Sequence, residues 1–106
     1  MFKFVSPAKG FRISILSGAQ AYIDAECAEK PELARLWGAL FARMKMTALK
    51  EGTELHNGFW SYVAEGSVKL GIPTLQVTFT HDLHTLFIRH AMVWQPGDED
   101  EDDEFD

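Results

Sequence analysis

Hydrophobic and polar residues alternate most regularly near the end of the chain, over residues 74–94. Leu75, Val77 and Phe79 alternate with polar residues, and this period of two predicts a strand with one buried face. The run that follows is hydrophobic on both faces, with Leu86, Ile88 and Met92 predicted on one side and Phe87, Ala91 and Val93 on the other. A strand of that kind is typically central and covered on both sides. The two runs predict a hairpin against which the rest of the chain packs.

The clearest helix signal covers residues 31–51, where hydrophobic residues recur at spacings of three and four. The resulting apolar stripe consists of Leu33, Leu36, Trp37, Leu40, Phe41, Met44 and Ala48. Pro31 suits the start of such a helix, while Lys50 in the last turn and Gly52 just beyond it are ordinary stop signals. This helix is expected to supply much of the core.

Two further elements are predicted before the long helix. Residues 11–16 alternate between hydrophobic and polar positions, which favours a strand. Ser17 and Gln20 fit the capping-box pattern, in which both side chains bond to the free backbone N–H groups of a helix start. A helix from about residue 18 to residue 29 is therefore expected.

After the long helix, glycines divide the chain into short pieces. Residues 59–63 favour a strand, and residues 68–70 are interpreted as its continuation or its partner. The complete order is a strand, a two-helix hairpin, and then a mainly antiparallel sheet of three to four strands. This order predicts an α+β domain in which the helical pair covers one face of the sheet.

Charge is distributed unevenly along the chain. At 106 residues and 46% hydrophobic content, the chain is sufficient for one domain with one core. Residues 98–106, DEDEDDEFD, hold eight of the sixteen acidic residues, so the rest of the chain has eight acids against ten lysines and arginines. We therefore predict a slightly basic domain over residues 1–97 and a disordered acidic tail over residues 98–106.

The tail has three interpretations. It folds back on a basic surface of its own domain, it binds a basic surface of a partner, or it only aids solubility. Of the two binding interpretations the partner contact is favoured, because a contact within the chain would mask the basic surface. Either contact would weaken as salt shortens the screening length.

Several function classes are excluded by what the sequence lacks. The single cysteine, Cys27, cannot form an internal disulfide or a cysteine-based zinc cluster. No apolar run approaches the roughly 20 residues of a membrane span, and the first residues lack the apolar segment of a secretory signal, so we expect a cytoplasmic protein without a membrane partner. No phosphate-binding glycine loop or cofactor fingerprint is present, and no cofactor is predicted. His81, Asp82 and His84 have metal-binding side chains, but they are interpreted as solvated turn residues because a fourth ligand is missing.

The element order resembles that of the RelE/ParE superfamily of small toxins from bacterial toxin–antitoxin pairs, and two stretches add to the resemblance. Residues 58–63, GFWSYV, resemble the family's glycine followed by a tryptophan-bearing strand. Residues 86–93, LFIRHAMV, resemble the family's last strand, which commonly reads as aliphatic residues followed by His-Ala-Phe. The resemblance covers roughly residues 11–94. It implies the family's fold, action on translation-associated RNA or on a target such as a gyrase, and neutralisation by a partner peptide.

The chain departs from the ribonuclease members of that family at several cationic positions. Those members tend to have an arginine after the tryptophan strand, another at the start of the next strand, and lysines after His-Ala-Phe. The corresponding places here resemble Tyr62-Val63, Gln76 and Trp94-Gln95. Since such cations stabilise the charge of a cleaving phosphate, the resemblance implies the fold more strongly than it implies cleavage.

Three residues are candidates for catalysis. His90 lies in the last strand beside Arg89, so it would act as a general acid–base while Arg89 holds an anion. The structural alternative for His90 is a partly buried histidine bonded to the backbone. Tyr62 would orient a substrate or stack on a base, and its structural alternative is packing on a face of the sheet.

Four residues are candidates for binding a partner or a nucleic acid. Arg35, Arg43 and Lys50 share one side of the long helix and would follow a phosphate backbone, although three cations on a helix also suit an ordinary solvated face. Trp94 follows the last strand and would serve as an exposed anchor for a partner.

Two hypotheses of function follow from these features. The first is a toxin-like module of a bacterial toxin–antitoxin pair, acting on translation-associated RNA or on a host protein. The second is a non-enzymatic protein from a phage or mobile element that binds and inhibits a host nucleic-acid-handling protein. An accessory domain without either role is the plainer alternative. A neighbouring gene for a small antitoxin would distinguish the first two.

Overall fold

The computed structural model describes residues 10–94, which form an α+β domain. Its elements in chain order are β1 (Arg12–Ile15), α1 (Ser17–Glu29), α2 (Glu32–Glu51), β2 (Thr53–Glu54), β3 (Trp60–Ala64), β4 (Thr74–His81) and β5 (Thr85–Trp94). The predicted order of a strand, two helices and a following set of strands is confirmed. The predicted acidic tail, residues 98–106, lies outside the described residues.

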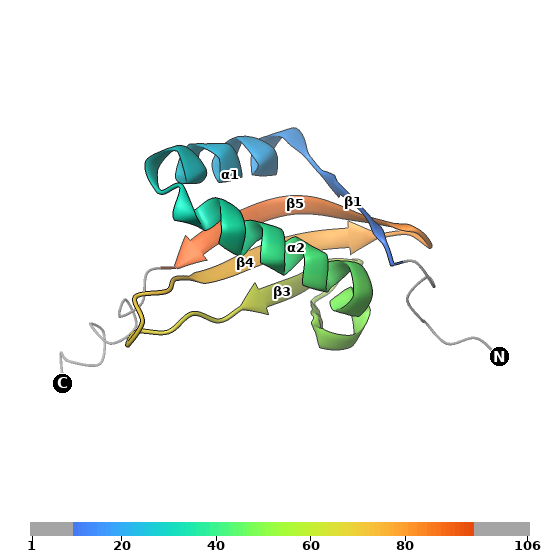
Figure 1. Ribbon diagram of the computed structural model, residues 1–106. Coiled ribbons are helices and arrows are strands. Elements are labelled where there is room, and N and C mark those ends of the chain that lie inside the picture. Colours follow the sequence, from blue (N-terminus) through green and yellow to red (C-terminus); the bar gives the residue numbers. More distant parts are fainter. Residues whose placement is uncertain (1–9, 95–106) are drawn as a thin grey trace.

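The strands form one five-stranded sheet in the order β1-β5-β4-β3-β2. Neighbouring strands are antiparallel except for β1, which pairs parallel to β5. Both helices lie on the same face of this sheet (Figure 1). The domain therefore has two layers, and within the described residues the central strand β5 is covered by helices on one side only.

Helix α2 supplies the core as its apolar stripe predicts. Five of the seven stripe residues are buried, namely Leu33, Trp37, Leu40, Met44 and Ala48. The other two, Leu36 and Phe41, are partly buried and pack against the same cluster. Burying such side chains is worth about 1.5–3 kcal/mol each, and this burial holds α2 on the sheet. The helix ends at Gly52, whose N–H bonds to the carbonyl of Ala48.

The start of α1 differs from the sequence prediction. The capping box is not formed, because Leu16 is the residue before the helix and no side chain caps it. The N–H of Leu16 bonds to the carbonyl of Ile88 at 3.0 Å, so the sheet fixes this residue and the helix begins directly after it. The side chain of Gln20 instead donates to Asp24 Oδ1 at 2.9 Å, one turn further along.

The faces of β5 also differ from the prediction, and the cause is a β-bulge at Arg89. Thr78 pairs with His90 and Phe79 pairs with Ile88, which leaves Arg89 as the extra residue between them. Beyond the bulge, Ala91 and Val93 therefore pack against the core, and Met92 is 46% exposed. The predicted placement of Met92 with Leu86 and Ile88, and of Ala91 and Val93 on the opposite face, is wrong.

The segment between β3 and β4 is a turn. Residues 68–70, predicted to continue β3 or pair with it, form part of a tight loop closed by Ser67 and Ile72, whose backbones bond to each other at 2.8 and 2.9 Å. A side chain at Gly66 would meet the backbone of Ile72 and Pro73, so the loop needs a glycine there. Leu70 at its tip is 72% exposed.

Candidate functional site

The candidate site is the face of the sheet that no helix covers in the described part of the chain. Strand pairing and alternation define this open face. Its residues are Arg12, Ser14, Thr53, Phe59, Ser61, Val63, Thr74, Gln76, Thr78, Thr80, Thr85, Phe87, Arg89, His90, Met92 and Trp94. Their neighbours along β4, namely Leu75, Val77 and Phe79, are almost completely buried beneath the helices.

Arg89 is held in place by two contacts on the open face. Its Nε donates to Thr80 Oγ1 at 3.0 Å, and its guanidinium carbon lies 5.8 Å from the centre of the Phe59 ring. A cation over an aromatic face is attracted by the ring, and the hydroxyl fixes the rotation of the guanidinium group. The bulge thus presents an exposed cation that Thr80 and Phe59 orient.

His90 follows Arg89 and lies on the same face. It pairs with Thr78 across the strands, and its side chain is exposed. The structural alternative from the sequence, a partly buried histidine, is therefore wrong. The bulge brings a titratable imidazole and a guanidinium group to adjacent positions on one surface, which a regular strand would not do because successive side chains alternate.

The open face is cationic, and none of the residues that β1 to β5 place on it carries a carboxylate. Arg12 of β1 adds a second exposed arginine at the edge beyond Phe87. The acidic residue of the short strand β2, Glu54, pairs with Trp60 and so belongs to the helix side. Arg12 pairs with Thr85, whose N–H bonds to Asp82, so an acid lies near Arg12, whereas the contacts of Arg89 are with Thr80 and Phe59. Arg89 is thus the cation of this face that is best placed to attract an anion.

The end of the open face near the β5 terminus is more apolar. Val63, Met92 and Trp94 are 45%, 46% and 41% exposed. The indole N–H of Trp94 donates to Gln76 Oε1 at 3.0 Å, and Gln76 Nε2 in turn donates to Ser61 Oγ at 3.2 Å. This chain of hydrogen bonds crosses three strands and fixes the Trp94 ring, so the predicted exposure of Trp94 is confirmed and its role as an anchor stays a prediction.

Tyr62 lies on the opposite side of the sheet from Arg89 and His90. It is 2% exposed beneath α2, and its hydroxyl donates to Glu51 Oε1 at 2.9 Å and lies 2.8 Å from Thr47 Oγ1. The three residues proposed for catalysis therefore do not form one site. Burial raises the pKa of the Tyr62 phenol, and the Glu51 carboxylate raises it further. The hydrogen bond from Tyr62 lowers the pKa of Glu51.

We expect Tyr62→Phe to destabilise the domain by about 1 kcal/mol at neutral pH, the usual net value of one hydrogen bond. The pKa of Glu51 is lower in the folded protein, so the stability that it contributes is present above its unfolded pKa of roughly 4.3 and is lost as pH falls through the folded value. The difference in the free energy of unfolding between the unmodified protein and Tyr62→Phe, measured with urea, should therefore be smaller at pH 3 than at pH 7. Equal differences at both pH values would contradict this role for Glu51.

The three cations predicted to share one side of α2 have different surroundings. Arg43 forms an ion pair with Glu51, with 3.1 Å between Nε and Oε1. Arg35 lies near the start of the helix, where it lines a cleft, and Lys50 is exposed in the last turn. They belong to the helix side, so they do not extend the cationic part of the open face.

The turn between β4 and β5 is organised by Asp82. Its Oδ1 accepts hydrogen bonds from the N–H groups of His84 and Thr85, at 2.8 and 2.7 Å, and these bonds lower the pKa of its carboxyl group. His81 packs against the rings of Phe11 and Trp60 on the helix side. In the part of the chain that the structure describes, no three histidine, cysteine or acidic side chains gather in a group that would hold a metal ion.

Comparisons with known proteins give no identification, since no family model, curated protein or solved structure matches this chain. Within residues 10–94, neither helix is both long enough and apolar enough to cross a membrane.

Sequence reasoning missed Arg12, Phe59 and Phe87 as members of the open face. Phe59 directly precedes β3 and lies near Arg89, and Arg12 begins β1 and pairs with Thr85 of β5. Pairing between strands that are distant in the sequence leaves no local pattern. Phe87 does carry a signal, because it alternates with the buried residues Leu86 and Ile88. Its assignment to the face of Ala91 and Val93 failed only because the bulge was not foreseen.

Proposed function

We propose that the protein is a toxin-like module that binds single-stranded RNA on the open face of its sheet. The observation that carries the proposal is the composition of this face: two arginines, one histidine and partly exposed aromatic rings, with no carboxylate among the residues that β1 to β5 place on it. Phosphates would interact with Arg12 and Arg89, and unpaired bases would stack on Phe59 and Phe87.

This chemistry suits RNA in a single strand better than a duplex. Sequence-tolerant binding of single strands combines cations along the backbone with aromatic rings on which bases stack. A row of threonine and serine hydroxyls on β3 and β4 adds hydrogen-bonding groups for bases and for the 2′-hydroxyl. A sheet face without a covering helix gives such a strand space to lie flat.

The pair Arg89 and His90 supports strand cleavage as part of the proposal. The imidazole of His90 would take the proton of a ribose 2′-hydroxyl, whose oxygen attacks the adjacent phosphorus while the bond to the 5′-oxygen breaks. The 5′-oxygen would leave with a proton from water, and a 2′,3′-cyclic phosphate would remain on the other fragment. Arg89 would stabilise the negative charge on the phosphate oxygens. Tyr62 takes no part in this scheme, because it lies under α2 on the other side of the sheet.

The toxin assignment draws support from the element order and from the resemblance of residues 58–63 and 86–93 to the RelE/ParE superfamily. In such a pair an antitoxin peptide would neutralise the module, and the compartment of action would be the bacterial cytoplasm. The apolar end of the open face, with Val63, Met92 and Trp94, is a suitable contact for that protein partner.

Expression of residues 1–97 in bacteria is expected to arrest growth, and Arg89→Ala or His90→Ala is expected to relieve the arrest. The physical reason is that each substitution removes one member of the proposed cation and base pair. Colony counts after induction measure the effect, with protein solubility checked in parallel. Lys50→Ala and His56→Ala are matched controls, since both residues are exposed and lie outside the open face; they should remain toxic.

The second candidate function is a non-enzymatic protein of phage or mobile-element origin that inhibits a host nucleic-acid-handling protein. The observation that favours it is the exposed apolar group at the β5 end of the open face, which suits a protein partner. Unimpaired growth with soluble protein, together with no binding of single-stranded RNA, would replace the toxin proposal with this one.

A further inference from the structure

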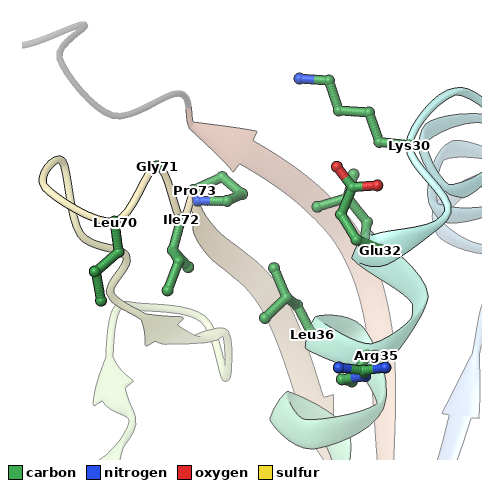
Figure 2. Close-up of a pocket in the computed structure, with 9 residues that line it drawn as sticks. Lys30, Glu32, Arg35, Leu36, Leu70, Gly71, Ile72 and Pro73 are labelled. Atoms are coloured by element: carbon green, nitrogen blue, oxygen red, sulfur yellow. The ribbon is translucent and has the colours of Figure 1, made fainter.

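A cleft on the helix side of the domain has no role in the proposed RNA binding. It has a volume of about 310 Å³ and lies between the start of α2 and the loop that joins β3 to β4. Figure 2 shows Leu70, Ile72 and Pro73 on one side of it, with Leu36 on the helix opposite. These side chains give the cleft an apolar lining that is open to solvent.

The loop that forms one wall is rigidly built. The backbone bonds between Ser67 and Ile72 close it, the N–H of Gly66 donates to Thr74 Oγ1 at 2.9 Å, and the N–H of Leu70 donates to Ser67 Oγ at 3.3 Å. Leu70 is therefore exposed at a fixed position. A preformed apolar cleft binds a side chain without the entropic cost of ordering its own wall.

The rim of the cleft is cationic. Lys30 and Arg35 line it and are both exposed, and neither forms an ion pair with another described residue. Among the described residues that line the cleft, Glu32 is the one carboxylate. The cleft thus suits a segment that combines one large apolar side chain with several negative charges.

The described part of the chain ends beside this cleft. Trp94, the last residue of β5, pairs with Thr74, which directly follows Pro73 in the cleft wall. Paired Cα atoms of antiparallel strands are about 4.5–5.5 Å apart. Phe105 lies eleven positions after Trp94, and an extended chain spans about 3.3 Å per residue, so the chain is more than long enough for residue 105 to reach the cleft.

Residues 98–106, DEDEDDEFD, have the composition that the cleft requires, with one phenylalanine among eight carboxylates. We propose that this acidic segment binds in the cleft of its own domain, with the ring of Phe105 against Leu36, Leu70 and Ile72 and its carboxylates facing Lys30 and Arg35. The cleft is on the helix side, and therefore this inference does not depend on RNA binding by the open face.

A labelled peptide of residues 98–106 tests the proposal. It should bind a protein of residues 1–97, measured by fluorescence anisotropy at 0.1 M salt. The full chain should bind the same peptide much more weakly, because its own segment is present at an effective concentration in the millimolar range. Replacing Phe105 by alanine in the peptide should weaken binding by about tenfold or more, since the aromatic side chain that fills the cleft is then missing.

Two variants of residues 1–97 locate the contact. Leu70→Asp and Arg35→Glu should each weaken peptide binding by about tenfold, because one removes apolar lining and the other reverses a rim charge. The matched controls are Leu83→Asp, at an equally exposed leucine in the β4–β5 turn, and Lys50→Glu, at the far end of the same helix. All four positions are exposed, so the variants should unfold at similar temperatures.

Three outcomes would overturn the proposal. The first is absence of peptide binding to residues 1–97. The second is equal weakening by the cleft variants and their controls. The third is an NMR result. If the segment binds its own domain, the amide resonances of Leu36 and Ile72 should differ between the full chain and residues 1–97 by the same amount at every protein concentration. A difference that grows with concentration, together with a dimer in light scattering, would mean that the segment binds a second copy and would overturn the proposal.

Discussion

Leu40→Ala is expected to lower the free energy of unfolding by about 2–5 kcal/mol, the usual range for a leucine truncated in a core. Leu40 is 2% exposed and lies on the buried stripe of α2 beside the apolar side chains of β4. Alanine would remove apolar contact area and leave a cavity that the surrounding helix and sheet cannot fully close. Chemical denaturation of both proteins, followed by the change in midpoint, measures the loss.

Two companion variants show whether burial sets the size of the effect. Phe41→Ala should lower the free energy of unfolding by less than the truncation of a fully buried phenylalanine would. The reason is that Phe41 is only partly buried, although its ring stacks on Trp37 with 5.8 Å between ring centres. Leu83→Ala should have almost no effect, since Leu83 is 74% exposed. Equal midpoints for Leu40→Ala and the unmodified protein would place the stripe of α2 outside the core.

Arg89→Glu is expected to reduce the affinity for a single-stranded RNA of about 12 nucleotides by at least about tenfold, because it replaces a phosphate-binding cation with a repelling charge. Arg89 is the cation that Thr80 and Phe59 orient on the open face. The dependence of affinity on salt should also become weaker, by about one unit of slope for each phosphate that the variant protein no longer neutralises. Fluorescence anisotropy over a series of salt concentrations measures both quantities.

Lys50→Glu is the matched control for Arg89→Glu. It makes the same change of charge at an exposed residue of α2, on the other side of the sheet. Its effect on RNA binding should be small and should vanish at high salt, because a distant charge acts only within the screening length. Equal losses for the two variants would mean that net charge alone, and not the open face, determines binding.

The elements of this fold could be predicted from the sequence because their signals are local. The stripe of α2 repeats over several turns, and five of its seven residues are buried as expected. The alternation of Leu75, Val77 and Phe79 likewise predicts β4 and its buried face. Periodicity over a long segment averages out single exceptions, which is why these predictions are confirmed.

The site could be predicted only in part, because it depends on pairing between strands. Arg89 and His90 are neighbours with useful chemistry in the sequence, but the bulge that turns both toward the open face has no signature there. Tyr62 was grouped with them, although alternation along β3 places it with Trp60 and the helices. A strand pattern shows which residues share a face, and only the pairing shows which face is covered.

The position of β5 has a consequence for how the protein folds. This strand is the last element in the described chain, yet it lies between β1 and β4 and contributes Leu86 and Ile88 to the core. Until residue 85 and those after it have been synthesised, β1 has no strand to pair with and α1 lacks the surface on which it packs. Pairing over so long a sequence separation must first overcome the entropy of closing the chain, so we expect folding to be slow and to occur in one late step. A nascent chain would therefore expose the apolar side of α2 until the later strands become available to cover it, and exposed apolar surface of this kind favours aggregation.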